Sequence, residues 1–185
     1  KNKYIISNYE TNLVLDHYKK NLDNINNTFK GNAYNNNYRK YFIAANPVTL
    51  HLENIIESNN NINIYNNYAA TLKADGMRYL LYVVNSEDEY KDMIYLINNN
   101  FQFIKTGYKL DGFGGTILEG EYIPSKKMIL LYDALYFKNK DIRKLQFDAP
   151  LTKKISNDNN NTRIDFLRSF IKSLENIVQD NILIT

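Results

Sequence analysis

The stretch from Thr71 to Asn85 reads TLKADGMRYLLYVVN, and it joins a lysine, a tight turn and a long apolar run. Its second half is rich in aromatic and β-branched residues, which is typical of a strand, and the run at 80–84 predicts burial on both faces. Asp75-Gly76 is a turn signal, and YAATLKADG at 68–76 predicts an earlier strand that ends in this turn. The sequence therefore places Lys73 where a strand meets a turn.

Four segments downstream also have the apolar patterns of strands. Turns rich in asparagine, glycine or proline separate them, because these residues favour turn conformations. The expected strands are DMIYLINNN (92–100), FQFIKTGYKL (101–110), TILEGEYI (116–123) and KMILLYDALYF (127–137), after which KNKDIRKL (138–145) is expected to leave the sheet.

Helical periodicity occurs near both ends of the chain. Residues Thr11–Phe29 and Thr162–Val178 place apolar side chains at spacings of three and four, and Thr162 with Asp165 resembles a capping box. We expect a short helix at His51–Ile56 and a polar loop at 151–161. The predicted apolar faces are Val14, Tyr18, Leu22, Ile25 and Phe29 in the first helix and Ile164, Leu167, Ile171, Leu174 and Val178 in the last.

The order of these elements predicts the fold class. A helix comes first, then six strands in succession, then a helix, which favours an α+β fold with a largely antiparallel sheet over alternating β-α-β units. We expect an N-terminal helical segment at 1–40, followed by the sheet-containing unit at 41–185.

Composition restricts the chemistry that the chain can perform. Its 185 residues include no cysteine and two histidines, which excludes thiol catalysis and cysteine-zinc sites and disfavours a histidine metal site. The net charge of +3 suits a phosphate-bearing ligand, but it does not by itself predict nucleic-acid binding. No apolar run approaches the roughly 18 residues needed to span a bilayer, so we expect a cytoplasmic protein without a membrane partner.

Lys73 is a candidate nucleophile. Lysine attacks only when neutral, and burial or nearby positive charge lowers its pKa from about 10.4. Arg78 would supply positive charge and could fork two hydrogen bonds to a ribose or phosphate oxygen, while Gly76 lets the backbone approach a ligand. Taken alone, this short pattern fits an ordinary surface lysine beside an Asp-Gly turn better than a catalytic one.

Two later blocks add polar groups to apolar strands. Glu119 and Glu121 alternate in ILEGEYI and so share one face of a strand. Side by side, two carboxylates repel, so the pair calls for a cation or ribose hydroxyls as a partner. Tyr132, in LLYDALYF, could stack on a nucleobase, although a tyrosine of the core fits the same pattern.

The three blocks together resemble a known family. LKADGMR, LEGEYI and ILLYDALYF are similar, in order and spacing, to motifs I, III and IIIa of the covalent nucleotidyltransferases, which comprise ATP-dependent DNA ligases, RNA ligases and mRNA capping guanylyltransferases. The flanking stretches NPVTLHLENI, MIYLINNNFQFIKTG and YDALYFKNKDIRKL resemble the guanylyltransferase domain of large DNA virus capping enzymes, of the poxvirus and giant-virus type.

This resemblance implies a fold and a reaction. The fold is a nucleotidyltransferase (ATP-grasp-like) domain, of which 41–185 would be the front part, because motifs IV and V and the OB-fold lid are not found after Arg143. In the reaction, Lys73 would attack the α-phosphorus of GTP and form lysyl-GMP. GMP would then pass to the 5′-diphosphate end of RNA, with Mg²⁺ or Mn²⁺ offsetting phosphate charge.

The resemblance also implies roles in nucleotide binding. Arg78 would contact ribose or phosphate, Glu121 the ribose or a metal-bound water, and Tyr132 would stack on guanine. The other implied positions are Thr71 and Leu72, whose backbone would read the base edge, Asp75 and Gly76, which shape the turn, and Glu119, where many relatives have aspartate.

Two alternatives stay open from the sequence. An ATP-dependent DNA or RNA ligase would form lysyl-AMP on the same lysine, and the motifs do not distinguish GTP from ATP. A non-catalytic nucleotidyltransferase-like interaction module is the other, because motifs IV and V are not found. For a capping enzyme, the expected partners are GTP, the 5′ end of RNA, other capping-enzyme domains or subunits and the viral RNA polymerase, in the cytoplasm, in a viral factory or in a virion.

Overall fold

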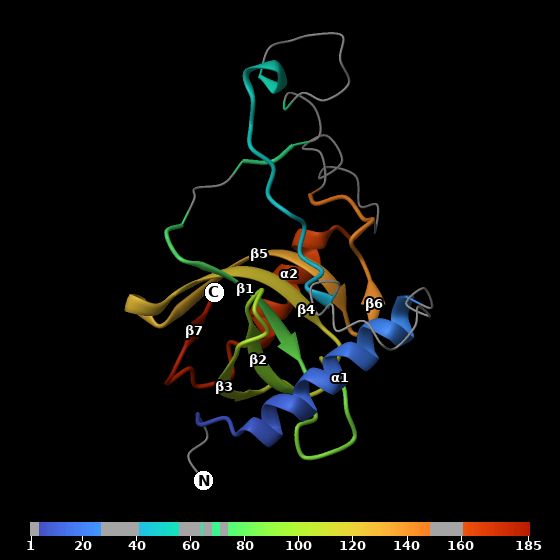
Figure 1. Cartoon of the computed structure of the whole chain (residues 1–185), viewed down its shortest axis with the longest axis vertical. Coiled ribbons are helices and arrows are strands. Elements are labelled where there is room, and N and C mark those ends of the chain that lie inside the picture. Colours follow the sequence, from blue (N-terminus) through green and yellow to red (C-terminus); the bar gives the residue numbers. More distant parts are fainter. Residues whose placement is uncertain (1–3, 27–40, 56–63, 65–67, 71–73, 149–160) are drawn as a thin grey trace.

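A largely antiparallel sheet forms the body of the molecule (Figure 1). The computed structural model describes residues 4–24, 41–55, 64, 68–70, 74–148 and 161–185, and the backbone alone of 25 and 26. Within these residues the sheet has seven strands in the order β3-β2-β1-β4-β5-β6, with β7 pairing parallel to β5. The strands are β1 (Met77–Val83), β2 (Met93–Ile97), β3 (Phe103–Lys109), β4 (Ile117–Ile123), β5 (Met128–Phe137), β6 (Lys140–Asp141) and β7 (Leu183–Ile184).

The sheet is apolar on both faces, and each face packs against a helix. Along β1, Leu80 and Tyr82 join the cluster of α1 (Asn8–Asn26), whereas Leu81 and Val83 join that of α2 (Arg163–Ser173). Alternate residues of a strand point to opposite faces, so the helices cover opposite sides of the sheet. This confirms the prediction that 80–84 is buried on both faces, and the fold is α+β as the sequence indicated.

The N-terminal helix follows its predicted apolar face. It begins at Asn8, a few residues before the predicted start, and the Ser7 hydroxyl accepts a hydrogen bond from the Glu10 amide at 3.1 Å. Val14, Tyr18 and Leu22 are fully buried, as predicted. The remaining predicted face residues, Ile25 and Phe29, lie outside the described side chains.

The C-terminal helix is shorter than predicted. Its capping box of Thr162 and Asp165 is confirmed, but α2 ends at Ser173 and Val178 is 83% exposed. The chain then turns back so that β7 can pair with β5. Helical periodicity cannot reveal this pairing, because it depends on a strand that is distant in sequence.

Three other expectations need correction. Tyr68–Ala70 is not a strand: β1 begins at Met77, and the Gly76 amide donates to a side chain instead of a neighbouring strand. The segment KNKDIRKL stays in the sheet briefly, as β6 beside β5. The helix expected at His51 is a 3-10 turn, Leu52–Asn54, that buries no side chain. Most of the expected 151–161 loop lies outside the described residues.

Within the described residues, no helix is long and apolar enough to cross a bilayer.

Candidate functional site

A buried carboxylate, Glu119, ties three strands together beyond the apolar core. It lies on β4, and its Oε1 accepts hydrogen bonds from Arg78 Nε on β1 at 2.6 Å and from the Tyr132 hydroxyl on β5 at 2.8 Å. The Arg78 guanidinium also forms an ion pair with the same carboxylate. The Glu119 side chain is 7% exposed and that of Arg78 30%. One residue from each of the three motif blocks therefore meets at a single carboxylate.

A β-bulge places Tyr132 in this cluster. Glu119 pairs with Asp133, whereas Gly120 pairs with Leu131, so β5 carries one extra residue at Tyr132. A bulge of this kind redirects side chains, and bulges are common beside active sites. Burial raises the pKa of the Tyr132 hydroxyl, and the hydrogen bond to Glu119 raises it further. The hydroxyl therefore stays protonated at neutral pH and donates to Glu119.

Arg78 is also held from outside the motifs. Its NH2 group donates to the Ala45 carbonyl at 2.5 Å, and its guanidinium lies 5.9 Å from the centre of the Phe42 ring. The segment 41–45, which contains Phe42 and Ala45, is held in turn by α1, because the Tyr18 hydroxyl donates to the Tyr41 carbonyl at 2.7 Å. Sequence reasoning missed this support, because a contact to a backbone carbonyl leaves no trace in residue type.

Glu121 fixes the turn that leads into β1. The Gly76 amide donates to Glu121 Oε1 at 2.8 Å. A Cβ at position 76 would lie 2.6 Å from the Tyr122 carbonyl oxygen, so a side chain there would require the backbone to move. Glycine is thus needed for the close approach of this turn to the β4 backbone, whereas its predicted approach to a ligand stays a prediction. Asp75 lies in the same bend.

The predicted site residues divide into two groups. The structure brings together Arg78, Glu119 and Tyr132, with the Gly76–Glu121 contact on the adjoining part of strands β1 and β4. The nucleophile itself, Lys73, lies outside the described residues, as do Thr71 and Leu72. Their expected roles stay predictions.

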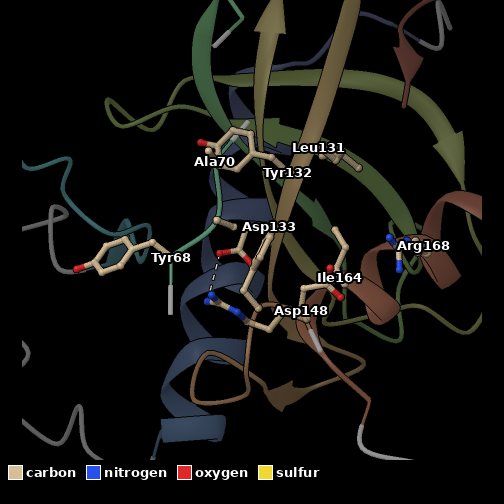
Figure 2. A pocket seen from close by; sticks show the side chains of 11 residues that line it. Tyr68, Ala70, Leu131, Tyr132, Asp133, Asp148, Ile164 and Arg168 are labelled. Carbon is tan, nitrogen blue, oxygen red and sulfur yellow. Dashed lines mark ion pairs between the residues drawn. The ribbon is translucent and has the colours of Figure 1, made fainter. Parts of the chain in front are cut away.

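A pocket of about 610 Å³ opens beside Tyr132 (Figure 2). One wall comes from 68–70, which immediately precedes the lysine segment, and another from Leu131–Asp133 on β5. The rest of the lining is Phe147, Asp148, Arg163, Ile164 and Arg168. Tyr132 is the sole predicted site residue among these described lining residues, and its ring connects the buried cluster to the pocket.

An ion pair joins Asp133 and Arg163 in the lining of this pocket. The two side chains approach to 3.2 Å and are 18% and 21% exposed. Burial raises the pKa of the Asp133 carboxyl, and Arg163 opposes that rise. The sequence offered one signal for Asp133, a carboxylate beside an apolar run, but none for Arg163, which lies at the start of a helix assigned to packing.

The described acidic side chains near the cluster are engaged with protein groups. Among the described residues, no three acidic or histidine side chains gather as they would around a metal ion. Glu119 is occupied by Arg78 and Tyr132, and one oxygen of Glu121 accepts from Gly76. The described residues therefore do not form a metal site by themselves.

Comparison with known proteins identifies the family. The structure has the α+β class expected from the motifs, and the cluster of Arg78, Glu119 and Tyr132 lies beside a pocket. The family described as mRNA capping enzyme, catalytic domain, matches residues 9–177. Because this match covers most of the chain, the protein belongs to the mRNA capping enzyme catalytic-domain family. A search of curated proteins finds no match.

Proposed function

We propose that this domain is an mRNA guanylyltransferase that uses Lys73 as its nucleophile. The observation that carries the proposal is the contact of Arg78, Glu119 and Tyr132. These residues come from three separate motif blocks, and the cluster borders a pocket beside the chain that leads to Lys73. The family match supports the same reaction class.

The proposed reaction has two steps. In the first, the neutral Lys73 amine attacks the α-phosphorus of GTP, a nitrogen–phosphorus bond forms, and pyrophosphate leaves with the electrons of the broken phosphorus–oxygen bond. The amine loses a proton to solvent or to pyrophosphate. In the second, a terminal oxygen of the RNA 5′-diphosphate attacks the same phosphorus. The nitrogen–phosphorus bond then breaks, its electron pair stays on the nitrogen, and a proton from solvent restores the lysine amine.

The described residues would serve this chemistry by binding and orientation. Tyr132 would stack on the base, and such stacking is worth about 1–3 kcal/mol in nucleic-acid complexes. Arg78, pre-oriented by Glu119 and the Ala45 carbonyl, would direct its remaining N–H donors at ribose or phosphate. Gly76 and Glu121 would hold the turn after the lysine. Mg²⁺ or Mn²⁺, when bound, would offset phosphate charge.

The setting of the reaction follows from the same proposal. The 5′ end of RNA is the acceptor, and other capping-enzyme domains or subunits and an RNA polymerase are the proposed partners. The proposed location is the cytoplasm.

A label-transfer experiment tests the proposal. The longest available form of the protein is incubated with Mg²⁺ and α-labelled GTP or ATP in parallel, denatured, and examined for label on the protein. We expect label from GTP and none from the Lys73→Ala variant, whose fold should be intact because the change removes no apolar side chain. Label from ATP would indicate a ligase instead. No label from either nucleotide would favour the non-catalytic interaction module.

Label that persists on Lys73→Ala would disprove the assignment of the nucleophile. Lys109→Ala is the matched control. Lys109 is the last residue of β3, its ammonium pairs with exposed Asp111, and in the sheet it lies opposite Met93, which is not one of the predicted site residues.

A further inference from the structure

We propose that Asp133 and Arg163 read the nucleobase and select guanine over adenine. This inference rests on the proposed function, since it assigns the base specificity of the same pocket.

The first argument is position. Tyr132 and Asp133 are consecutive residues at the β5 bulge, and both line the pocket (Figure 2). Arg163 lines the same pocket from the first turn of α2 and forms an ion pair with Asp133 there. A base that stacks on the Tyr132 ring would therefore have its edge close to a carboxylate and a guanidinium.

The second argument is unused hydrogen-bonding capacity. Asp133 Oδ1 accepts from the Ala134 amide at 2.7 Å, and Oδ2 faces Arg163 NH1 at 3.2 Å. A carboxylate can accept about four hydrogen bonds, so each oxygen retains a site. The Nε of Arg163 is buried and has no hydrogen-bond partner among the described residues. The pair therefore has hydrogen-bonding capacity that is not used. A buried polar group without a hydrogen-bond partner costs free energy, so a ligand that supplies the partner would be favoured.

The third argument is charge. The described lining contains two carboxylates, Asp133 and Asp148, and two guanidiniums, Arg163 and Arg168. A phosphate would meet two negative groups in this pocket. A nucleobase edge is neutral and presents donors beside acceptors, which matches an acceptor-only carboxylate next to a donor-only guanidinium.

Guanine fits this pair better than adenine. Its N1–H and N2–H can donate together to the two oxygens of Asp133, while its O6 can accept from Arg163. Adenine offers one donor at N6, and its N1 lone pair would face the carboxylate. Correctly matched bidentate contacts of arginine or carboxylate groups with bases give discrimination of about ten- to hundredfold.

The experiment is a competition for binding, which does not need catalysis. Fluorescent mant-GTP bound to the protein is displaced with GTP, ITP, XTP or ATP. ITP lacks the 2-amino group, so we expect it to bind about tenfold more weakly than GTP, and ATP to bind more weakly still. Equal affinities of the unmodified protein for GTP, ITP and ATP would overturn the proposal without any variant.

Asp133→Asn provides a gain-of-function readout. An asparagine can accept from N1–H and donate to the O2 of xanthine, so the variant should bind XTP about tenfold more tightly and GTP about tenfold more weakly. The matched control is Asp141→Asn, which removes the carboxylate of another ion pair on the same sheet, away from the described lining, and should leave the nucleotide order unchanged. If Asp133 had a purely structural role, the variant would bind all nucleotides more weakly by the same factor, and that result would overturn the inference.

Label transfer measured in parallel separates the two proposals. Suppose that GTP labels the protein, and that the ratio of the affinities for GTP and XTP is the same in Asp133→Asn as in the unmodified protein. This result would refute base reading and leave the guanylyltransferase proposal standing. If no nucleotide labels the protein but Asp133→Asn binds XTP more tightly than GTP, the guanylyltransferase proposal would be refuted and base reading supported.

Discussion

Two clusters in this protein combine a buried carboxylate, a tyrosine hydroxyl and a cation at different places in the fold. In one, Glu119 accepts from the Tyr132 hydroxyl and pairs with Arg78. In the other, Glu10 on α1 accepts from the Tyr95 hydroxyl at 2.6 Å and pairs with Lys105 at 2.5 Å.

The surroundings distinguish the two clusters. Lys105 and Tyr95 are opposite each other on β3 and β2, and with Glu10 they are closed under α1, with the Lys105 and Glu10 side chains 12% and 9% exposed. The Glu119 cluster lies where Arg78 is 30% exposed and Tyr132 lines the pocket. A carboxylate, a tyrosine and a cation therefore do not define a site by themselves. Access to a pocket distinguishes a candidate binding cluster from one that fastens a helix to the sheet.

The largest effect on stability is expected from Lys105→Ala. The change leaves Glu10 buried without its cation, and breaking a buried pair in this way costs about 3–5 kcal/mol. Urea unfolding measures the loss. The double variant Glu10→Gln/Lys105→Met should recover much of it, because no unpaired charge remains. Label transfer per folded molecule should change little in either variant, and a large loss there would show that both clusters serve the reaction.

The largest effect on activity among the described residues is expected from Arg78→Ala. Removing a pre-oriented charged donor typically costs about a hundredfold in rate, and the initial rate of label attachment measures it. Arg78→Lys should retain charge without the planar fork, and it should lose about tenfold. If Arg78→Ala lowered stability as much as Lys105→Ala and left the rate unchanged, the distinction between the clusters would fail.

A smaller effect is expected when the two tyrosine hydroxyls are removed. Tyr95→Phe and Tyr132→Phe each delete one hydrogen bond to a carboxylate, which is worth about 1.5–3 kcal/mol of unfolding free energy. Tyr132→Phe keeps its ring and should bind mant-GTP almost normally, whereas Tyr132→Leu should bind it at least about fivefold more weakly through lost stacking. Equal affinities for the Phe and Leu variants would argue that no base stacks on this ring.

The smallest effect is expected from a more open ion pair, Asp141 with Arg143. Hydrogen bonds from Arg143 lower the pKa of the Asp141 carboxyl below 3.8. The pair therefore contributes stability that is present above pH 3.8 and is lost as the pH falls through the lower pKa of the folded state. Asp141→Asn should cost less than about 1 kcal/mol at neutral pH. Urea unfolding at neutral and acid pH checks this, and an undiminished cost at acid pH would contradict it.

Part of the candidate site could be read from residue order. The Asp-Gly turn signal identified Gly76, and the alternation of glutamates in a predicted strand identified Glu119 and Glu121. Both patterns are readable because turn and strand geometry are local properties. The sequence could not show that Glu119 is committed to Arg78 and Tyr132, since their contact requires three strands in one register and a bulge. Arg163 was missed for the same reason: its partner comes from a distant strand.

The sequence by itself determined most of the strand and helix segments, the α+β class and the motif positions, because apolar periodicity and turn chemistry act over a few residues. Only the tertiary structure decided which polar residues meet. It joined Arg78 to Ala45, paired Asp133 with Arg163 and returned the C-terminus to β5. Polar groups that become buried on folding are nearly always hydrogen-bonded or ion-paired. Which partner each group has depends on residues that are distant in sequence, so the local sequence does not determine it.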